Sequence, residues 1–369
     1  MNRLFRWDQM GLFLLALAAG ILPFAVPEVC AAALREGLAL CSGPLLLSLF
    51  PFLVVSRLLV QCPESDLLAM PFRLAAWGIG IRTPCAARVL CIGFLGGFAP
   101  AASAAAQAVR TGQLTVEEAD ALLPACICSG PSFVVLTVGQ SLLGSAELGV
   151  LLFASQITAN YLTAALLNRF AGVRSVKPGS AAPASSAPPR LDEILADAAI
   201  TYCKLCGFIL FFRMLAAGAG ALLPAGAGTL CAVLLEVCSG CDLASRTGRW
   251  GSLLCCAALS VQGLSVLLQV RTICPPEMTL RPLYRARMLH LPLSLALFYL
   301  LLPGGEADVF STLPVRVLLM RRVPPDCALL VFAVCCMAAC TLRGGIRQVE
   351  QKQMARNAGG CCINSKTLL

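Results

Sequence analysis

Charged side chains are scarce in this sequence. They make up 13% of the 369 residues, whereas an ordinary soluble domain carries about a quarter. Hydrophobic residues make up 58% of the chain, and the mean hydropathy is +0.82. Several apolar runs approach or exceed the roughly 18 residues that cross a bilayer, and most lie far from the N-terminus. The composition therefore excludes an ordinary soluble domain and predicts a polytopic membrane protein held in a lipid bilayer.

Histidine is almost absent, since His290 is the only one. Most of the 21 cysteines lie inside apolar runs, and the C-x-x-C pairs at 203–206 and 238–241 have neither a second pair nor a histidine cluster beside them. Structural zinc sites need four such ligands. We therefore expect no metal site, and we interpret the cysteines of the apolar runs as small packing residues. Only Cys361 and Cys362, in a polar tail, are expected to be reactive or acylated.

Motifs of the common enzyme classes are also missing. The chain has no phosphate-binding loop, no histidine-containing zinc pattern, no Ser-x-x-Lys motif and no nucleophile elbow. We therefore expect no enzyme activity and no cofactor. The classes that remain are membrane proteins that carry solutes and membrane proteins that act as scaffolds.

Acidic residues are absent from the segment Gly172 to Arg190, which is rich in proline, alanine and serine. The net charge of the chain is +9, but the basic residues lie in loops between apolar runs, so the positive-inside rule explains them better than nucleic-acid binding. We expect no nucleic-acid partner. The segment is predicted to be a disordered cytoplasmic linker. It divides the chain into a membrane half (residues 1–170), the linker (171–190), a second membrane half (191–342) and a basic cytoplasmic tail (343–369).

Three apolar runs follow the linker, from Ile194 to Leu223, from Ala225 to Leu243 and from Leu253 to Val270. The next loop, Arg271 to His290, carries four arginines against one glutamate and is also predicted to be cytoplasmic. The number of crossings between two cytoplasmic segments must be even. We therefore expect one of the three runs to turn back within the membrane.

The stretch from Arg88 to Arg110 is long enough to span a bilayer, yet glycine, alanine and serine fill its middle. Gly93 and Gly97 form a small-xxx-small pair that allows another backbone to approach closely. Pro100 removes a backbone donor and clashes with the preceding turn, which predicts a kink or break near Phe98. Backbone freed at membrane depth must find a partner in protein, in a water-filled cavity or in a ligand. The stretch is thus either a substrate-facing element or a tight packing face without a ligand.

Short interruptions recur in both halves. Ser129-Gly130-Pro131 breaks another apolar segment, Cys-Ser-Gly occurs at 41, 128 and 238, and the glycine-rich centre near Gly96 has a shorter counterpart in residues 262–266. Paired halves with interrupted helices are a signature of repeat-built transporters whose site lies near the midplane. The sequence predicts an all-α polytopic membrane protein with broken or re-entrant helices and two pseudo-repeated halves.

Several motifs follow one another in an order that covers most of the chain. They are Leu49-Phe50-Pro51-Phe52, Gly93 to Pro100, Glu117-Glu118-Ala119, Ser129 to Phe133, Leu235-Glu236 with Ser239-Gly240, and Gly263-Leu264-Ser265-Val266 with Gln269. In this order and spacing the chain resembles the YlbJ-type sporulation integral membrane proteins of the nucleoside-recognition (Gate domain) family. Two positions depart from the family pattern, because Cys128 stands where an asparagine is usual and Gln262 where a glycine is usual.

The resemblance implies a transporter-like fold with one Gate-like repeat in each half. It also implies a role in moving dipicolinate, a small organic dianion, across the outer forespore membrane of a sporulating bacterium. Two alternatives stay open. One is a structural or assembly protein needed for spore maturation, and the other is a carrier of nucleoside-like solutes.

A site for such an anion should offer helix N-termini, freed backbone N–H groups, hydroxyl groups and a cation. The broken elements supply the first three. The predicted substrate-binding residues are Gly96, Gly97, Ser103, Ser129, Gly130, Ser132, Gln262 and Ser265. The candidate cations are Arg88 and Arg213, for which the alternative is a snorkelling side chain near an interface.

Glu236 is the main acidic residue inside an apolar run. Ionisable groups at membrane depth are costly and usually functional. We interpret Glu236 as a site for proton or cation coupling, and the alternatives are a carboxylate at a helix end or one paired with an arginine such as Arg213.

Overall fold

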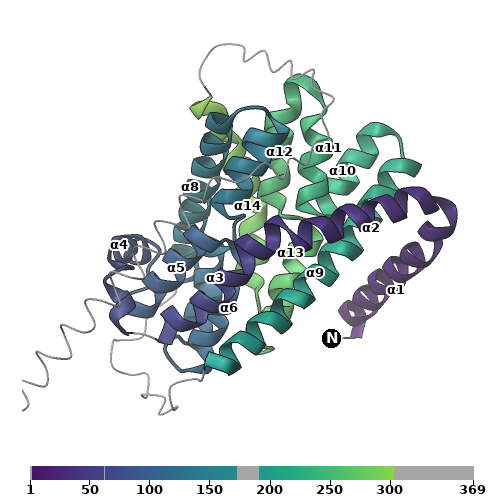
Figure 1. Cartoon of the computed structure of the whole chain (residues 1–369). Helices are drawn as coiled ribbons and strands as arrows, with labels where there is room; N and C mark the ends of the chain where they lie inside the picture. The colour runs from purple at the N-terminus through teal and green to yellow at the C-terminus, as the bar shows by residue number, and fades with distance from the viewer. Residues whose placement is uncertain (1, 62, 173–190, 303–369) are drawn as a thin grey trace, which may run out of the picture.

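The computed structural model describes residues 2–61, 63–172 and 191–302 of the chain (Figure 1). Most of the linker, the end of the second half from residue 303 and the tail with Cys361 and Cys362 lie outside the described residues, so the predictions made for them stay predictions. Every regular element within the described ranges is a helix. The all-α fold predicted from the sequence is therefore confirmed.

The helices divide between the two halves of the chain. Before the linker they are α1 (Asn2–Ala25), α2 (Pro27–Ser42), α3 (Pro44–Gln61), the 3₁₀ turn η1 (Pro63–Asp66), α4 (Met70–Gly78), α5 (Pro84–Gly96), α6 (Phe98–Arg110), α7 (Val116–Cys126), the π-helix η2 (Ser132–Leu142) and α8 (Ala146–Ala171). After the linker they are α9 (Leu191–Leu222), α10 (Ala225–Leu235), α11 (Val237–Ser245), the 3₁₀ turn η3 (Gly248–Trp250), α12 (Gly251–Val261), α13 (Gly263–Ile273) and α14 (Arg281–Leu301).

Three stretches of the described chain are long and apolar enough to cross a membrane. They are α8, α9 and Gly248–Ile273, which joins η3, α12 and α13. The pair formed by α1 and α2 is bent by 110° and adds a fourth if it counts as one span. The chain is thus a multi-pass membrane protein, as its composition predicts.

α5 and α6 form a hairpin that turns back on itself at Gly97. A Cβ placed on Gly93 would lie 3.2 Å from the Cβ of Ala101, although eight residues of straight helix span about 12 Å. Gly97 ends α5 and begins α6 with a φ of 80°. The break predicted near Phe98 is confirmed.

α10 and α11 form a second hairpin, which turns at Glu236. A Cβ placed on Gly240 would lie 2.8 Å from the Cα of Val233, so the two helices lie side by side (Figure 1). α12 and α13 instead continue in one direction as a single broken span. Of the three apolar runs after the linker, the middle one therefore turns back, as the even number of crossings requires.

Three polar contacts establish which helix ends share a face. Asp120, near the start of α7, accepts hydrogen bonds from the backbone N–H groups of Thr279 and Leu280, which precede α14. Asn168, near the end of α8, donates to the carbonyl oxygen of Ala121 in α7. We call this face, where α8 ends and α9 begins, the linker-side face.

The same face holds the open end of the first hairpin. Thr83, which precedes α5, hydrogen-bonds Glu118 near the start of α7. The second hairpin follows the far end of α9, where a Cβ on Gly228 would lie 3.0 Å from the Cα of Gly220. The two hairpins thus enter from opposite faces, which is the arrangement expected of inverted pseudo-repeats.

The topology predicts which loops a protease can reach from one side of the membrane. Protease sites inserted in the linker and after Glu277 are expected to be cut from the same side, because α8, α9, α13 and α14 all have ends there. A site at Gly144, between η2 and α8, is the control and should be cut only from the other side. Cleavage of the linker and the Glu277 site from opposite faces would contradict the topology.

Candidate functional site

The tip of the first hairpin lies against the break between α7 and η2. Gly97 has a φ of 80°, and a Cβ on it would lie 2.7 Å from the backbone nitrogen of Gly130 and 3.2 Å from the carbonyl oxygen of Cys128. Real Cβ atoms do not approach backbone this closely, so only glycine fits at the tip. The structure thereby brings together Gly96, Gly97, Ser129 and Gly130, four of the predicted site residues.

The tip of the second hairpin meets the break between α12 and α13 in the same way. A Cβ on Gly263, whose φ is 68°, would lie 2.9 Å from the backbone nitrogen of Glu236 and 2.9 Å from the carbonyl oxygen of Leu235. Gln262 is buried at this break and has a φ of 65°, in the left-handed region. Each half therefore contains a hairpin whose tip contacts a broken crossing helix, which is the structural basis of the pseudo-repeat.

Glu236 is 2% exposed and is the N-cap of α11. Its two carboxylate oxygens accept hydrogen bonds from the backbone N–H groups of Cys238 (2.8 Å) and Ser239 (2.7 Å). A helix N-terminus carries partial positive charge and favours an anion. The chain's own carboxylate therefore occupies the N-terminus of α11, and Glu236 does lie at a helix end, as one of the sequence alternatives held.

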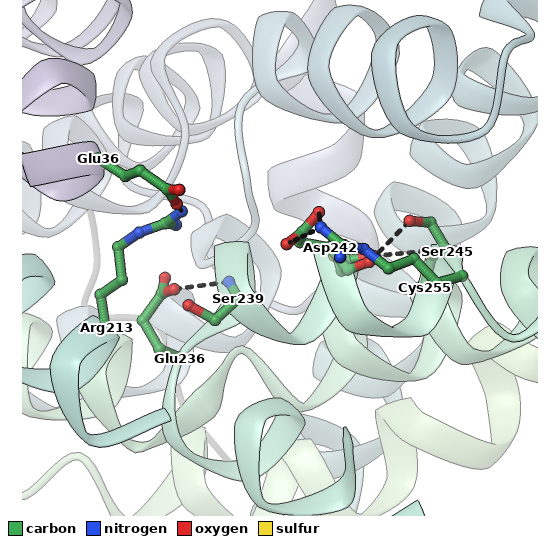
Figure 2. A network of polar contacts seen from close by, with 9 residues as sticks. Glu36, Arg213, Glu236, Ser239, Asp242, Ser245 and Cys255 are labelled. Atoms are coloured by element: carbon green, nitrogen blue, oxygen red, sulfur yellow. Dashed lines mark hydrogen bonds and ion pairs between the residues drawn. The ribbon is translucent and has the colours of Figure 1, made fainter. Parts of the chain in front are cut away.

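Arg213 does not form its ion pair with Glu236. Its guanidinium donates to Glu36 of α2 at 2.8 Å, and Figure 2 shows Arg213 reaching up to Glu36, with Glu236 below on the same side. The suggested pairing of Glu236 with Arg213 is therefore wrong. Instead, the two oxygens of Glu236 accept from the backbone N–H groups of α11, while the guanidinium of Arg213 is directed to Glu36.

A cavity of about 160 Å³ opens between the two halves near the linker-side face. α3 and α6 line it from the first half, and α9 and α13 from the second. Three basic side chains, Arg57, Arg110 and Lys204, face one acidic side chain, Asp197. The lining thus carries an excess of positive charge between a hairpin helix and a broken crossing helix.

Arg57 connects the walls of this cavity. It donates to Ser103 of α6 (3.3 Å), to Asp197 of α9 (2.5 Å) and to Thr201 one turn further along α9 (3.4 Å). The Arg57 side chain is only 10% exposed, whereas that of Asp197 is 60% exposed. Ser103, predicted as a site residue, therefore lies in the cavity wall as a hydrogen-bond partner of Arg57.

The wall formed by α13 adds an unpartnered polar group. Gln269 is 2% exposed, and its amide nitrogen donates to the hydroxyl of Ser265 at 2.9 Å. Its side-chain oxygen has no hydrogen-bond partner among the described residues. Gln269 lines the cavity, and Ser265, another predicted residue, lies one turn earlier on α13 and positions its side chain.

The two cations proposed from the sequence are not part of the cavity. Arg88 pairs with Asp66 at 3.0 Å and donates to the carbonyl oxygen of Val60, so it fastens η1 to α3 and α5. Arg213 pairs with Glu36. Both assignments are corrected, because neither guanidinium lines the cavity and each fastens two elements elsewhere in the fold. Ser132 begins η2 directly after the first break and is half-buried.

Arg287 of α14 is a buried residue that the sequence analysis did not single out. It is 7% exposed and donates to the carbonyl oxygen of Ile127 at 2.6 Å, and at 3.4 Å to the carbonyl oxygen of Ser260 and to Asn160 Oδ1. Its sequence position placed it in a basic loop, whereas α14 extends back through that loop to Arg281. The apolar run after His290 continues back through the loop at helical spacing, and this pattern could have predicted that Arg287 lies within the helix.

No protein-family model, no curated protein and no solved structure matches this chain. Two features of the molecule therefore indicate its function, namely the paired hairpin tips and broken helices, and the basic cavity between the halves.

Proposed function

We propose that this protein is a membrane transporter of a small organic anion. The observation that carries the proposal is the cavity between the halves, in which Arg57, Arg110 and Lys204 face Asp197. Of the three cations, Arg57 is buried, whereas Arg110 and Lys204 are exposed, so an entering anion would pair with Arg57 and be attracted by the other two. The volume of about 160 Å³ suits a small molecule.

The position of the cavity supports transport over simple binding. Its walls include α6, which descends from the Gly97 tip, and α13, which descends from the Gln262 break. In repeat-built transporters, movement of one half against the other around a fixed site alternates access. A solute held between α6 and α13 would be exposed to the linker-side face in one arrangement and sealed from it in the other.

Arg57 is the central binding residue in this proposal. Asp197 is largely exposed and can leave, whereas the guanidinium is held in the wall by Ser103 and Thr201. The carboxylate of an entering anion would replace Asp197 as the partner of Arg57. Arg110 and Lys204 would attract the solute electrostatically, and Gln269 would accept a hydrogen bond from a donor group of the solute or from a water molecule.

The resemblance to the YlbJ-type proteins supports a particular solute and place. The proposed solute is dipicolinate, and the proposed place is the outer forespore membrane. A nucleoside-like solute would use the same cavity but would not need three basic side chains. A structural or assembly role in spore maturation would need no cavity at all. Glu236 keeps its proposed coupling role, as a carboxylate whose proton or cation binding would alter the hairpin tip.

Uptake by the purified protein in lipid vesicles tests the proposal. Radiolabelled dipicolinate is expected to enter, uridine is not, and Arg57→Met should lower dipicolinate uptake about tenfold or more, because charge-assisted hydrogen bonds are worth about 1.5–3 kcal/mol. Asp197→Asn removes the competing carboxylate and should lower KM about two- to fivefold, since partly exposed ion pairs are worth up to about 1 kcal/mol.

The control is Arg246→Met, which breaks an exposed ion pair with Asp242 on α11 and should leave uptake unchanged. Uptake of uridine in place of dipicolinate would favour the nucleoside carrier. No uptake of either, together with a failure of spores that lack the protein to mature, would favour the structural role.

A further inference from the structure

The breaks in the two crossing helices leave backbone carbonyl groups without their usual donors. In an α-helix the carbonyl of Ile127 would accept from residue 131, but Pro131 has no N–H group. The carbonyl of Ser260 would accept from Leu264, but the left-handed turn at Gln262 ends α12 before that bond can form. Both carbonyls are therefore acceptors at the C-terminal ends of half-helices, where the helix dipole places partial negative charge.

One guanidinium serves both carbonyls. Arg287 Nη2 lies 2.6 Å from the oxygen of Ile127, and Nη1 lies 3.4 Å from the oxygen of Ser260. Asn160 completes the arrangement, because its Oδ1 accepts from Arg287 and its Nδ2 donates to Ile127 at 3.4 Å. Within the described part of the chain, no carboxylate lies within ion-pair distance of Arg287.

The carbonyl groups of Ile127 and Ser260 therefore compensate the charge of the buried Arg287. Interrupted helices of transporters use freed carbonyls and half-helix C-termini to coordinate sodium ions or protons. We propose that Arg287 is a built-in cation that occupies the carbonyl site created by the two broken helices. The protein therefore needs no metal cation at this place. The guanidinium of Arg287 links the break in the first half to the break in the second. Because it belongs to the chain, it cannot dissociate as a bound metal ion can.

The role of Arg287 is separate from the proposed transport and does not depend on which solute is carried. Any coupling ion would therefore bind at other groups, and Glu236 is the candidate named above. The proposed role of Arg287 also predicts that the positive charge of residue 287, and not only its packing volume, stabilises the fold.

Thermal unfolding of the purified full-length protein in detergent tests it. Wild type, Arg287→Lys, Arg287→Met, Arg287→Ala and the surface control Arg246→Ala are compared in sodium, potassium and choline chloride of equal ionic strength, and with a few millimolar guanidinium chloride added. A Glu236→Gln variant with Arg287 intact, which removes the candidate coupling carboxylate, should have the same midpoint in the three salts. Arg287→Met and Arg287→Ala should unfold at least about 5 °C lower than the control, and Arg287→Lys should lie between.

Small cations should restore part of the loss only where the side chain leaves room for them. We expect guanidinium or sodium ions, but not choline, to raise the midpoint of Arg287→Ala and to leave Arg246→Ala unchanged. A midpoint of this Glu236→Gln variant that is higher in sodium than in choline would overturn the proposal. So would equal midpoints for Arg287→Lys and Arg287→Met, which decide the question if Arg287→Ala cannot be purified.

Discussion

Replacing Gly97 by leucine is expected to abolish uptake, and even Gly97→Ala should lower it at least tenfold per molecule. The backbone of Gly97, with a φ of 80° and a ψ of −164°, lies in a region essentially restricted to glycine, which costs an L-residue about 1–3 kcal/mol. The added Cβ would also meet the backbone of Gly130 at 2.7 Å. Because that contact is with backbone, no side-chain rotation relieves it. The hairpin tip must then move away from the break between α7 and η2.

Gly80 provides a matched control for this prediction. Its φ of 88° is also positive, but a Cβ there would meet nothing within 4 Å. Gly80→Ala and Gly80→Leu should therefore lose only a little stability, through backbone strain, and should keep their uptake activity. Uptake and the amount of folded protein in the membrane are measured together. Equal losses for Gly97→Ala and Gly80→Ala would show that the close contact at the tip has no role.

Changing Glu236 to glutamine is expected to lower both stability and uptake. The amide can accept from only one of the two N–H groups of α11, and its own NH₂ group would face the other. Each hydrogen bond to a charged group is worth about 1.5–3 kcal/mol. We therefore expect a loss of about 2 kcal/mol, with uptake per molecule reduced as well because the turn at Glu236 contacts Gly263.

Two further substitutions separate the contributions at Glu236. Glu236→Asp keeps the charge and a favourable N-cap, so it should retain most of the stability. Glu147→Gln removes an exposed carboxylate from the first turn of α8. It therefore measures only the stability that a carboxylate contributes through the helix dipole. Unchanged stability in Glu236→Gln would contradict the capping role, and normal uptake per folded molecule would contradict the coupling role.

The sequence by itself determined the class and the positions of the breaks. Low charge and long apolar runs require a bilayer. Gly97 with Pro100, and Ser129-Gly130-Pro131, favour breaks at these places, although prolines such as Pro51 and Pro124 lie inside helices. The even number of crossings between basic segments also required one run after the linker to turn back. These properties are local or additive along the chain, so they can be predicted from the sequence without the structure.

Only the tertiary structure decided which groups meet. Arg57, Arg110, Lys204 and Asp197 come from three helices in two halves of the chain, and no local pattern relates them. The sequence likewise could not tell that Arg88 and Arg213 are already paired, or that Arg287 lies on the carbonyls of Ile127 and Ser260. The physical reason is that the energy of a buried charge depends on its partners in space. Those partners are fixed only when the helices pack.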